Sequence, residues 1–247
     1  MKRHYNLYPS LLDAFCYMRS VEGDEADIKA AEQEFMDKVN RVPHDPSYYA
    51  ARGTALNELV DARVCHVVPQ HPVRYANEGD KGGVYTVDID TFSIDFAEAL
   101  VEQTAAWVDG MTAQVYCEAD IEVAQGVVTL YGYADYVEGR EVVDLKTSKD
   151  YQPDTRDFSG HWQHRVYPYC LMKSGMMAEV DKFTYLVASC KAGRDGIIDG
   201  QLYREPYDIT FEACERELRE FLEGEFLPWL EDHRDMITDT KIFNDED

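Results

Sequence analysis

The sequence predicts a mixed α/β fold in which one central sheet lies between helices. Apolar residues at helical spacing dominate residues 1–66, and another helical pattern precedes residue 110. Three consecutive runs rich in Val, Ile, Leu and Tyr then indicate strands. A helix, two more strand-like runs and a final helix follow, which completes the pattern of a mixed core.

Length and composition fit one domain that covers residues 1–247. Apolar residues make up 45% of the chain, enough for a substantial core. No apolar run is long enough to span a membrane, and the opening residues hold no secretory signal. We therefore expect a cytoplasmic protein with no membrane partner.

Charge and cysteine content narrow the function classes further. The net charge of −24 argues against indiscriminate binding to nucleic acid or anionic lipid. The six cysteines are scattered without a C-x-x-C pair, so we expect reduced, mostly buried thiols. His66 and His71 lack further ligands nearby, and we expect them at surface or packing positions rather than on zinc.

Three helices are predicted within residues 1–66, where apolar positions recur every three to four residues. Ser10 is a suitable cap for the first helix. Pro43 and Pro46 separate the second helix from the third. The predicted ranges are 8–19, 24–39 and 47–64.

An insertion is predicted at about residues 67–110. The glycine-rich cluster Asn77–Gly83 lies between two short strand-like runs and indicates a hairpin or a loop. It lacks the lysine-Ser/Thr ending of a phosphate-binding loop, so a turn is the better interpretation. Ser93 is then predicted to cap an amphipathic helix that extends through Trp107 and ends at Asp109-Gly110.

The remaining elements form the predicted sheet and its cover. A polar loop with Pro153 follows the third strand, and a helix is predicted from about Ser159 to Gly175. The last helix starts near Phe211 and is expected to bend at Pro228, and an acidic tail completes the segment 211–247. The five predicted strands cover residues 113–123, 126–137, 141–148, 182–190 and 200–210.

Two aspartates and a lysine occupy the second and third of these strands, where Val or Thr is more typical. A two-residue turn at Gly139-Arg140 places Asp135 directly opposite Asp144. A turn at Glu138-Gly139 makes the two aspartates diagonal neighbours on one face. A loop of three or four residues can instead place them on opposite faces. Lys146 shares the face of Asp144, because strand side chains repeat every second residue.

Opposed carboxylates on neighbouring strands repel each other unless a cation lies between them. Lys146 compensates one charge, and a hard divalent ion with oxygen ligands compensates more. The structural alternative is a solvated hairpin face on which Asp and Lys side chains pair. That alternative gives no reason for a second aspartate opposite the first.

The hairpin resembles the core of the PD-(D/E)XK nucleases, in particular the RecB-like branch with the lambda-type exonucleases and CRISPR-associated nuclease subunits. The family pattern is a Gly-x-x-Asp strand, a turn, and a strand that ends in Asp/Glu-x-Lys-Thr. The matching residues are Gly132, Asp135, Asp144, Lys146 and Thr147.

Two further motifs of this branch occur in the expected order. Gln163 and Tyr167 match its Gln-x-x-x-Tyr motif and lie on one helical face. Gly53, Thr54 and Glu58 match its upstream Gly-Thr-x-x-His-Glu motif. The resemblance also includes the opening of the chain, whereas residues between 69 and 125 are largely unmatched.

The chain departs from the family pattern at two places. Asn57 replaces the histidine that is a metal ligand in the family; an amide oxygen binds Mg²⁺ or Mn²⁺ but is neutral. Glu58 points about 100° away around the helix and is not an automatic substitute. The cysteine triplet of the iron–sulfur members is missing, so no iron–sulfur cluster is expected.

The resemblance implies a restriction-endonuclease-like core and a DNA nuclease, with exonuclease the expected mode. Phosphodiester hydrolysis would use water activated by Mg²⁺ or Mn²⁺. A lysine would orient or deprotonate that water, and the Gln-x-x-x-Tyr pair would steady the nucleotide or the lysine. The implied catalytic residues are Asp135, Asp144, Lys146, Gln163 and Tyr167, and the implied metal ligands are Asp135, Asp144, the Leu145 carbonyl and Asn57.

A run without acidic residues offsets the unfavourable overall charge. Residues 158–175 contain no Asp or Glu, so we expect a positive strip beside the hairpin. Trp162 and Tyr169 are candidates for base stacking, with core packing as the alternative, and Arg52 and Arg63 are candidates to extend the strip. The expected nucleic-acid-binding residues are Lys149, Arg156, His161, Arg165 and Lys173.

DNA is the expected partner, together with a recombination or single-strand-annealing protein and a second copy of the chain. The setting implied is recombination, repair, or phage or CRISPR-type DNA processing. Two alternatives remain open. A catalytically weak or inactive subunit of this fold would lose the Asp/Lys set, which is intact here. An acidic DNA mimic or interaction protein would have no reason to keep all three motifs.

Overall fold

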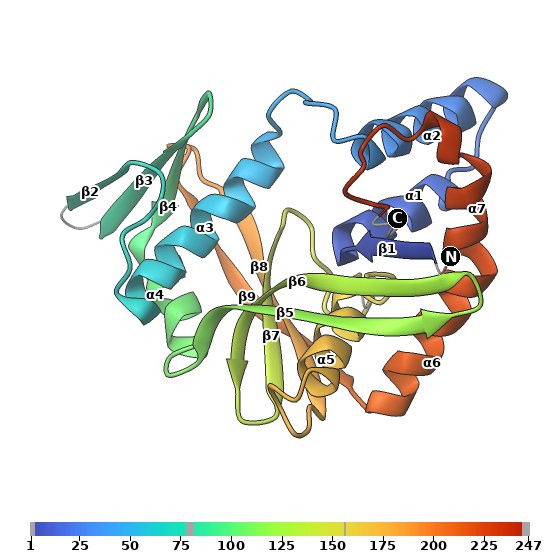
Figure 1. The fold of residues 1–247 in the computed structure, drawn as a ribbon. Coiled ribbons are helices and arrows are strands. Elements are labelled where there is room, and N and C mark those ends of the chain that lie inside the picture. The colour runs from blue at the N-terminus through green and yellow to red at the C-terminus, as the bar shows by residue number, and fades with distance from the viewer. Residues whose placement is uncertain (1–2, 78–81, 156, 244–247) are drawn as a thin grey trace.

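The computed structural model describes residues 3–77, 82–155 and 157–243. Within these residues, nine strands form one mixed sheet with helices packed against it (Figure 1). The mixed α/β class predicted from the sequence is confirmed. The strands are β1 (Arg3–Leu7), β2 (Val73–Asn77), β3 (Gly83–Ile89), β4 (Phe92–Ala97), β5 (Thr112–Val123), β6 (Gly126–Glu138), β7 (Glu141–Ser148), β8 (Lys182–Ala192) and β9 (Ile198–Asp208).

The helices gather in two groups around the sheet. Figure 1 shows α1, α2, α6 and α7 beside one end of the sheet and α4 near the β2–β4 end, with α3 crossing between them. The helices are α1 (Pro9–Ser20), α2 (Glu25–Val39), α3 (Tyr48–Cys65), α4 (Glu98–Trp107), α5 (Gln163–Lys173), α6 (Phe211–Phe221) and α7 (Leu227–Asp232), with a π-helical turn at Leu222–Phe226 and a 3₁₀ turn at Arg234–Met236.

The strand order is β1-β6-β7-β8-β9-β4-β3-β2, and β5 pairs with β6 outside this path. Since β5 occupies one edge of β6 along nearly its whole length, β1 and β7 share the other edge. β1 pairs with residues 126–130 and β7 with residues 136–138. The stretch 131–135 between them has no ladder partner on that edge among the described strands.

Two hydrophobic cores lie on opposite faces of β7. Val142 belongs to the core formed with α1, α2, α5, α6 and α7, whereas Val143 and Leu145 belong to the core formed with α3 and α4. Because side chains alternate along a strand, Asp144 points to the α5 side of the sheet. The alternation thus directs a charged residue into an otherwise apolar layer.

One end of the outer edge of β5 is covered by side chains rather than by a strand. The hydroxyl of Tyr169 donates to the carbonyl oxygen of Asp120 at 2.8 Å, and Arg219 donates to the carbonyl oxygen of Glu122. These donors come from α5 and α6. They satisfy backbone acceptors that the ladder with β6 leaves unpaired.

The structure corrects two element predictions near the chain start and in the predicted insertion. Residues 3–7 form β1, a strand that the sequence did not indicate. The helix predicted from Ser93 begins at Glu98 instead, because residues 92–97 form β4. The Ser93 hydroxyl donates to Asp88 at 2.7 Å rather than capping a helix. Phe92, Ile94 and Phe96 alternate along this strand and carry the period-two signal.

Two helix predictions in the second half also need correction. α5 starts at Gln163 rather than near Ser159, since the preceding residues form turns. The last helix does not simply bend at Pro228: a π-helical turn precedes this proline, which lies in the first turn of α7 and has no N–H to donate.

The expectations for the hairpin and for the cysteines are confirmed. β2 and β3 form the predicted hairpin, with Asn77 opposite Gly83, although residues 78–81 of its turn cluster lie outside the described residues. All six cysteines are free thiols and four of them are buried. Residues 244–247 of the acidic tail also lie outside the described residues. None of the helices in the described ranges is long and apolar enough to cross a bilayer.

Candidate active site

The β6–β7 hairpin has the register that a Gly139-Arg140 turn predicts. Pairing starts at Glu138–Glu141 and ends at Tyr136–Val143, and Gly139 adopts a φ of 57°. At the next position the strands separate, and the carboxylate of Asp135 accepts a hydrogen bond of 2.9 Å from the Leu145 N–H. The Asp135 side chain therefore takes the place of the backbone carbonyl that would accept from Leu145 if the two strands stayed paired.

Asp144 is held at the centre of this site by contacts from β7 and α5. Its side chain is 1% exposed, and its Oδ2 lies 2.5 Å from the Lys146 amine. Its Oδ1 accepts a hydrogen bond of 2.6 Å from the Gln163 amide, which lies 3.5 Å from the Tyr167 hydroxyl. Asp135 interacts electrostatically with Asp144 and Lys146, so all five predicted catalytic residues lie in one cluster.

The cluster holds two carboxylates against one amine. Burial raises the pKa of Asp135, and the charge of Asp144 raises it further. Burial also raises the pKa of Asp144, although Lys146 opposes that shift. Burial lowers the pKa of Lys146, but Asp144 and Asp135 outweigh it and the net shift is upward. The lysine is therefore protonated, and the carboxylates lack a second positive charge.

Gly132 is required because Tyr167 packs directly on β6. A Cβ atom at position 132 would lie 2.8 Å from Cε1 of Tyr167, closer than carbon atoms approach without displacement. Burial raises the pKa of the Tyr167 hydroxyl, so this group stays neutral and acts as a hydrogen-bonding partner.

Replacing Gly132 by Ala is expected to lower the free energy of unfolding by about 1–3 kcal/mol, because the tyrosine ring must move in a packed layer. Urea denaturation measures this difference. Gly160→Ala is the matched control, since a Cβ atom there meets nothing within 4 Å. Equal stability of the two variants would contradict the close contact at Tyr167.

One face of α3 lies against the hairpin. At one end, a Cβ atom built on Gly53 would lie 3.5 Å from the Thr147 hydroxyl, and at the other end Asp61 accepts a hydrogen bond of 2.7 Å from the Tyr136 hydroxyl. Asn57 lies midway at helical spacing, so it shares this face. Its buried Oδ1 has no hydrogen-bond partner among the described residues.

Asp61 is a residue of this site that the sequence motifs did not identify. Its charge helps raise the pKa of Asp135, and it accepts a hydrogen bond of 3.2 Å from Gln114. Gln114 adopts a left-handed φ of 52°, and the β5–β6 ladder omits the rung at this residue. The spacing of four residues from Asn57 is the signal that would have found Asp61.

Asp13 of α1 was also missed, and no local pattern indicates it. Its carboxylate accepts a hydrogen bond of 2.7 Å from the Trp162 N–H, 149 residues away in sequence, and lies 3.1 Å from His161. Its charge contributes to the raised pKa values of Asp144 and Lys146. Asp13 therefore anchors the start of α5 beside the cluster.

The predicted basic strip is divided between different environments. Arg165 donates to Glu217 at 2.6 Å, and the Lys173 amine lies 5.8 Å from the Phe211 ring centre. Lys149 is exposed and lines a separate cavity. Arg156 lies outside the described residues.

The candidate stacking residues pack in the core. Trp162 stacks on Phe221 at 4.2 Å between ring centroids, and Tyr169 stacks on Phe211 at 5.4 Å. Both side chains are buried, so the packing alternative holds for them. Arg63, a candidate to extend the strip, forms ion pairs with Glu102 and Glu98 instead.

His71 and Glu58 form a pair outside the cluster. The carboxylate of Glu58 accepts from the His71 backbone N–H at 3.1 Å and lies 2.7 Å from its ring nitrogen. This contact fits the expected packing role of His71. Glu58 therefore does not replace the family histidine at position 57.

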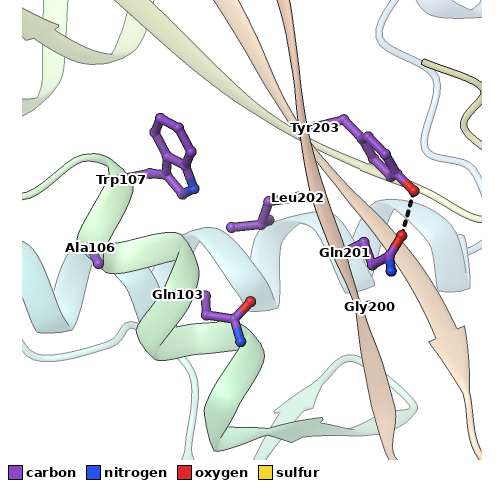
Figure 2. Close-up of a pocket in the computed structure, with 7 residues that line it drawn as sticks. All are labelled: Gln103, Ala106, Trp107, Gly200, Gln201, Leu202 and Tyr203. Atoms are coloured by element: carbon purple, nitrogen blue, oxygen red, sulfur yellow. Dashed lines mark hydrogen bonds between the residues drawn. The ribbon is translucent and has the colours of Figure 1, made fainter.

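A large surface hollow elsewhere has none of this chemistry. A cavity of about 620 Å³ lies between α4 and β9, where the Leu202 side chain points towards Trp107 (Figure 2). None of its lining residues is charged, and none belongs to the β6–β7 hairpin. The candidate site is therefore identified by its charges and not by the size of a cavity.

The donor set of the cluster fits a hard divalent cation. In the described part of the chain, no three His, Cys, Asp or Glu side chains converge as a ready metal site. The available donors are oxygen atoms of Asp135, Asp144 and Asn57, and the Leu145 carbonyl, which lies on the same side of its strand as the N–H bound by Asp135. The buried Asn57 oxygen, which no described group satisfies, favours such an ion.

Comparison with known proteins agrees with this chemistry. A family model described as "PD-(D/E)XK nuclease superfamily" matches residues 28–234. A solved structure titled "Crystal structure of SSO0001" is similar at 13% identity and a TM-score of 0.32, over 49% of this chain and 54% of that one. The chain thus spans about half the length of that structure, and a likeness this distant supports no inference. No curated protein matches the chain.

Proposed function

The chain belongs to the PD-(D/E)XK nuclease superfamily, whose members are typically phosphodiesterases that use divalent metals, and we propose that it is a metal-dependent DNA nuclease. Exonuclease is the proposed mode. The observation that carries the proposal is the convergence of Asp135, Asp144 and Lys146 on one side of the β6–β7 hairpin.

Asp135, Asp144, Asn57 and the Leu145 carbonyl would hold a Mg²⁺ or Mn²⁺ ion. When bound, the ion supplies a water of lowered pKa and offsets negative charge on the phosphate. Lys146 carries its own positive charge, because its carboxylate neighbours raise its pKa. Its role in the proposed reaction is therefore to orient the attacking water and to stabilise charge that develops on the phosphate.

Gln163 and Tyr167 are proposed as positioning residues. The Gln163 amide fixes the rotamer of Asp144 through the 2.6 Å hydrogen bond, and the buried, neutral Tyr167 supports that amide from one turn further along α5. Gln163→Glu would place a third carboxylate against the first two. We expect this variant to lose activity mainly in kcat, which single-turnover kinetics would separate from substrate binding.

Divalent cations are expected to stabilise the protein more strongly at pH 8 than at pH 5. The pKa values of Asp135 and Asp144 are raised in the folded state, so their contribution to stability is full at low pH and is lost as the pH rises through those values. A cation removes that loss, because it binds the ionised carboxylates. Thermal melting with Mg²⁺, Mn²⁺ or EDTA measures the effect.

The control for this experiment is the Asp135→Asn, Asp144→Asn double variant, which has no ionisable ligand left at the hairpin. It should melt at the same temperature with cation and with EDTA. A cation effect that persists in the double variant, or one that is independent of pH, would place the binding elsewhere.

Digestion of end-labelled linear DNA and closed circular DNA tests the activity and its mode. Cleavage of linear DNA alone with Mg²⁺ or Mn²⁺, and none with EDTA, supports an exonuclease. Cleavage of closed circles identifies an endonuclease. Binding without cleavage favours the inactive-subunit alternative, and neither binding nor cleavage favours the mimic. Recombination or phage DNA processing, a partner protein and self-association are proposed only from the family resemblance.

A further inference from the structure

A second cavity, of about 480 Å³, opens where α3 begins and where β7 and β8 end. Its wall carries three basic side chains from three different segments. Arg52 comes from α3, Lys149 follows β7, and Lys191 lies next to the last residue of β8. Asp150 is the one acidic residue of this lining. For a chain with a net charge of −24, this is an unusual local excess of positive charge.

Arg52 is the central observation. It is 5% exposed, yet its buried Nε has no hydrogen-bond acceptor among the described residues. Its guanidinium lies 5.3 Å from the ring centre of Tyr49, which supports it without neutralising its charge. Burial of a charged group without a partner costs free energy, so the side chain is poised for an anion that the protein itself does not supply.

The two lysines are also without counter-charges. Lys149 and Lys191 are exposed, and neither forms an ion pair with a carboxylate in the described ranges. A planar guanidinium flanked by two amines matches the oxygen atoms of a phosphate group. The position of the cavity then suggests the source of that phosphate.

The cavity adjoins the candidate active site through both of its main walls. Gly53, the neighbour of Arg52, lies close to Thr147 of β7, since a Cβ atom built on this glycine would be 3.5 Å from the Thr147 Oγ1. Lys149 follows Lys146 by three residues, which is about 10 Å of extended chain. Tyr49, 58% exposed, lies at the cavity and offers a ring face to a base or a sugar.

We propose that the Arg52 cavity binds a phosphate group of the polynucleotide substrate and so fixes the strand relative to the β6–β7 hairpin. This inference rests on the proposed nuclease function. The phosphate is either a terminal monoester or an internal diester, and the two differ in charge and in the position of the strand end.

Fluorescence anisotropy of 3′-labelled oligonucleotides that carry a 5′-phosphate or a 5′-hydroxyl tests the proposal. All variants are made in the Asp144→Asn protein, the parent, and are measured in EDTA. The oligonucleotide can then be bound without being cleaved. Arg52→Gln should weaken binding at least about tenfold, the loss expected for a charge-assisted hydrogen bond. The slope of log K against log salt should become shallower by roughly 0.7–0.9 for each phosphate that the variant no longer neutralises.

Two kinds of variant separate a binding role from a folding role. Lys191→Gln changes an exposed side chain outside the core, and it should weaken binding in the same direction without a change in melting temperature. Arg74→Gln is the matched control, since Arg74 is 65% exposed on β2 and pairs with Asp88. It should bind as the parent does.

The results distinguish a terminal phosphate from an internal one, and they separate the anion site from the proposed nuclease function. A loss confined to the 5′-phosphorylated strand assigns the cavity to a terminal monoester, and an equal loss for both strands assigns it to an internal diester. Unchanged affinity and salt slope in Arg52→Gln and Lys191→Gln overturn the proposal. If the wild-type protein cuts no DNA but titration with inorganic phosphate saturates and Arg52→Gln abolishes it, the anion site stands and the nuclease function fails.

Discussion

Asp144→Asn is expected to abolish metal-dependent DNA cleavage without lowering the melting temperature of the protein. The substitution keeps the shape of the side chain and an oxygen that accepts the Gln163 hydrogen bond. It removes one of two buried carboxylates that share a single lysine, so the mutual repulsion with Asp135 disappears. The same change removes a charged ligand from the proposed cation site.

The rate of cleavage should fall roughly a thousandfold or more, since a bound metal contributes several kcal/mol to transition-state stabilisation. Initial rates on labelled linear DNA with saturating Mg²⁺ measure the loss, and differential scanning calorimetry measures stability. Glu217→Gln, which changes the half-buried partner of Arg165 on α6, is the control for loss of one negative charge. Cleavage by Asp144→Asn at the wild-type rate would refute the assignment of the site.

Lys146→Met is also expected to reduce cleavage but, unlike Asp144→Asn, it should destabilise the protein. Loss of one charged donor from a site of this kind costs about 10²–10³-fold in rate. The variant also leaves Asp144, 1% exposed, beside Asp135 without the amine that lies 2.5 Å away. Removal of one partner from a buried pair costs roughly 3 kcal/mol at neutral pH.

The pH and a second substitution test the cause of this destabilisation. At pH 5 the raised pKa values allow the two carboxylates to take up protons, so Lys146→Met should recover much of its stability there. Adding Asp144→Asn to Lys146→Met should recover stability at pH 8, because a single carboxylate remains. If the effects of the two substitutions on the free energy of unfolding simply add, the side chains of Lys146 and Asp144 do not interact.

The hairpin was predictable from sequence because two local rules determine it. A glycine at the turn sets the register, and the period-two alternation of a strand then sets which side chains share a face. The structure confirms the pairing of Glu138 with Glu141, but the ladder ends at Tyr136–Val143, so Asp135 and Asp144 lie just beyond the last paired residues. The motif on α3 was equally local, and it placed Asn57 against the hairpin, where its oxygen is buried.

The errors arose where local signals competed or were absent. At residues 92–97 the alternation of Phe92, Ile94 and Phe96 indicates a strand, whereas Ser93 is also a typical helix cap, and the alternation prevails. β1 is five residues long, and it is stabilised by parallel pairing with residues more than 100 positions away. Sequence patterns carry no information about such a pairing.

The parts of the site that the sequence did not reveal are those that join distant segments. Asp13 reaches the cluster only because α1 packs beside α5, and the Arg52 cavity forms only where three segments meet. The basic strip on α5 was inferred from composition alone. Composition does not show that Glu217 of α6 lies against Arg165, and this pairing weakens the strip as a DNA track.

The partly covered edge of β5 has a consequence for how copies of this protein can assemble. A twelve-residue strand at the border of a sheet is normally open to pairing with another chain. Here Tyr169 and Arg219 occupy the carbonyl oxygens of Asp120 and Glu122, so strand-to-strand fusion of two molecules is blocked at that end of β5. On this border, β5 could pair with another molecule only along residues 112–119, which shortens the edge that is open to fibril growth.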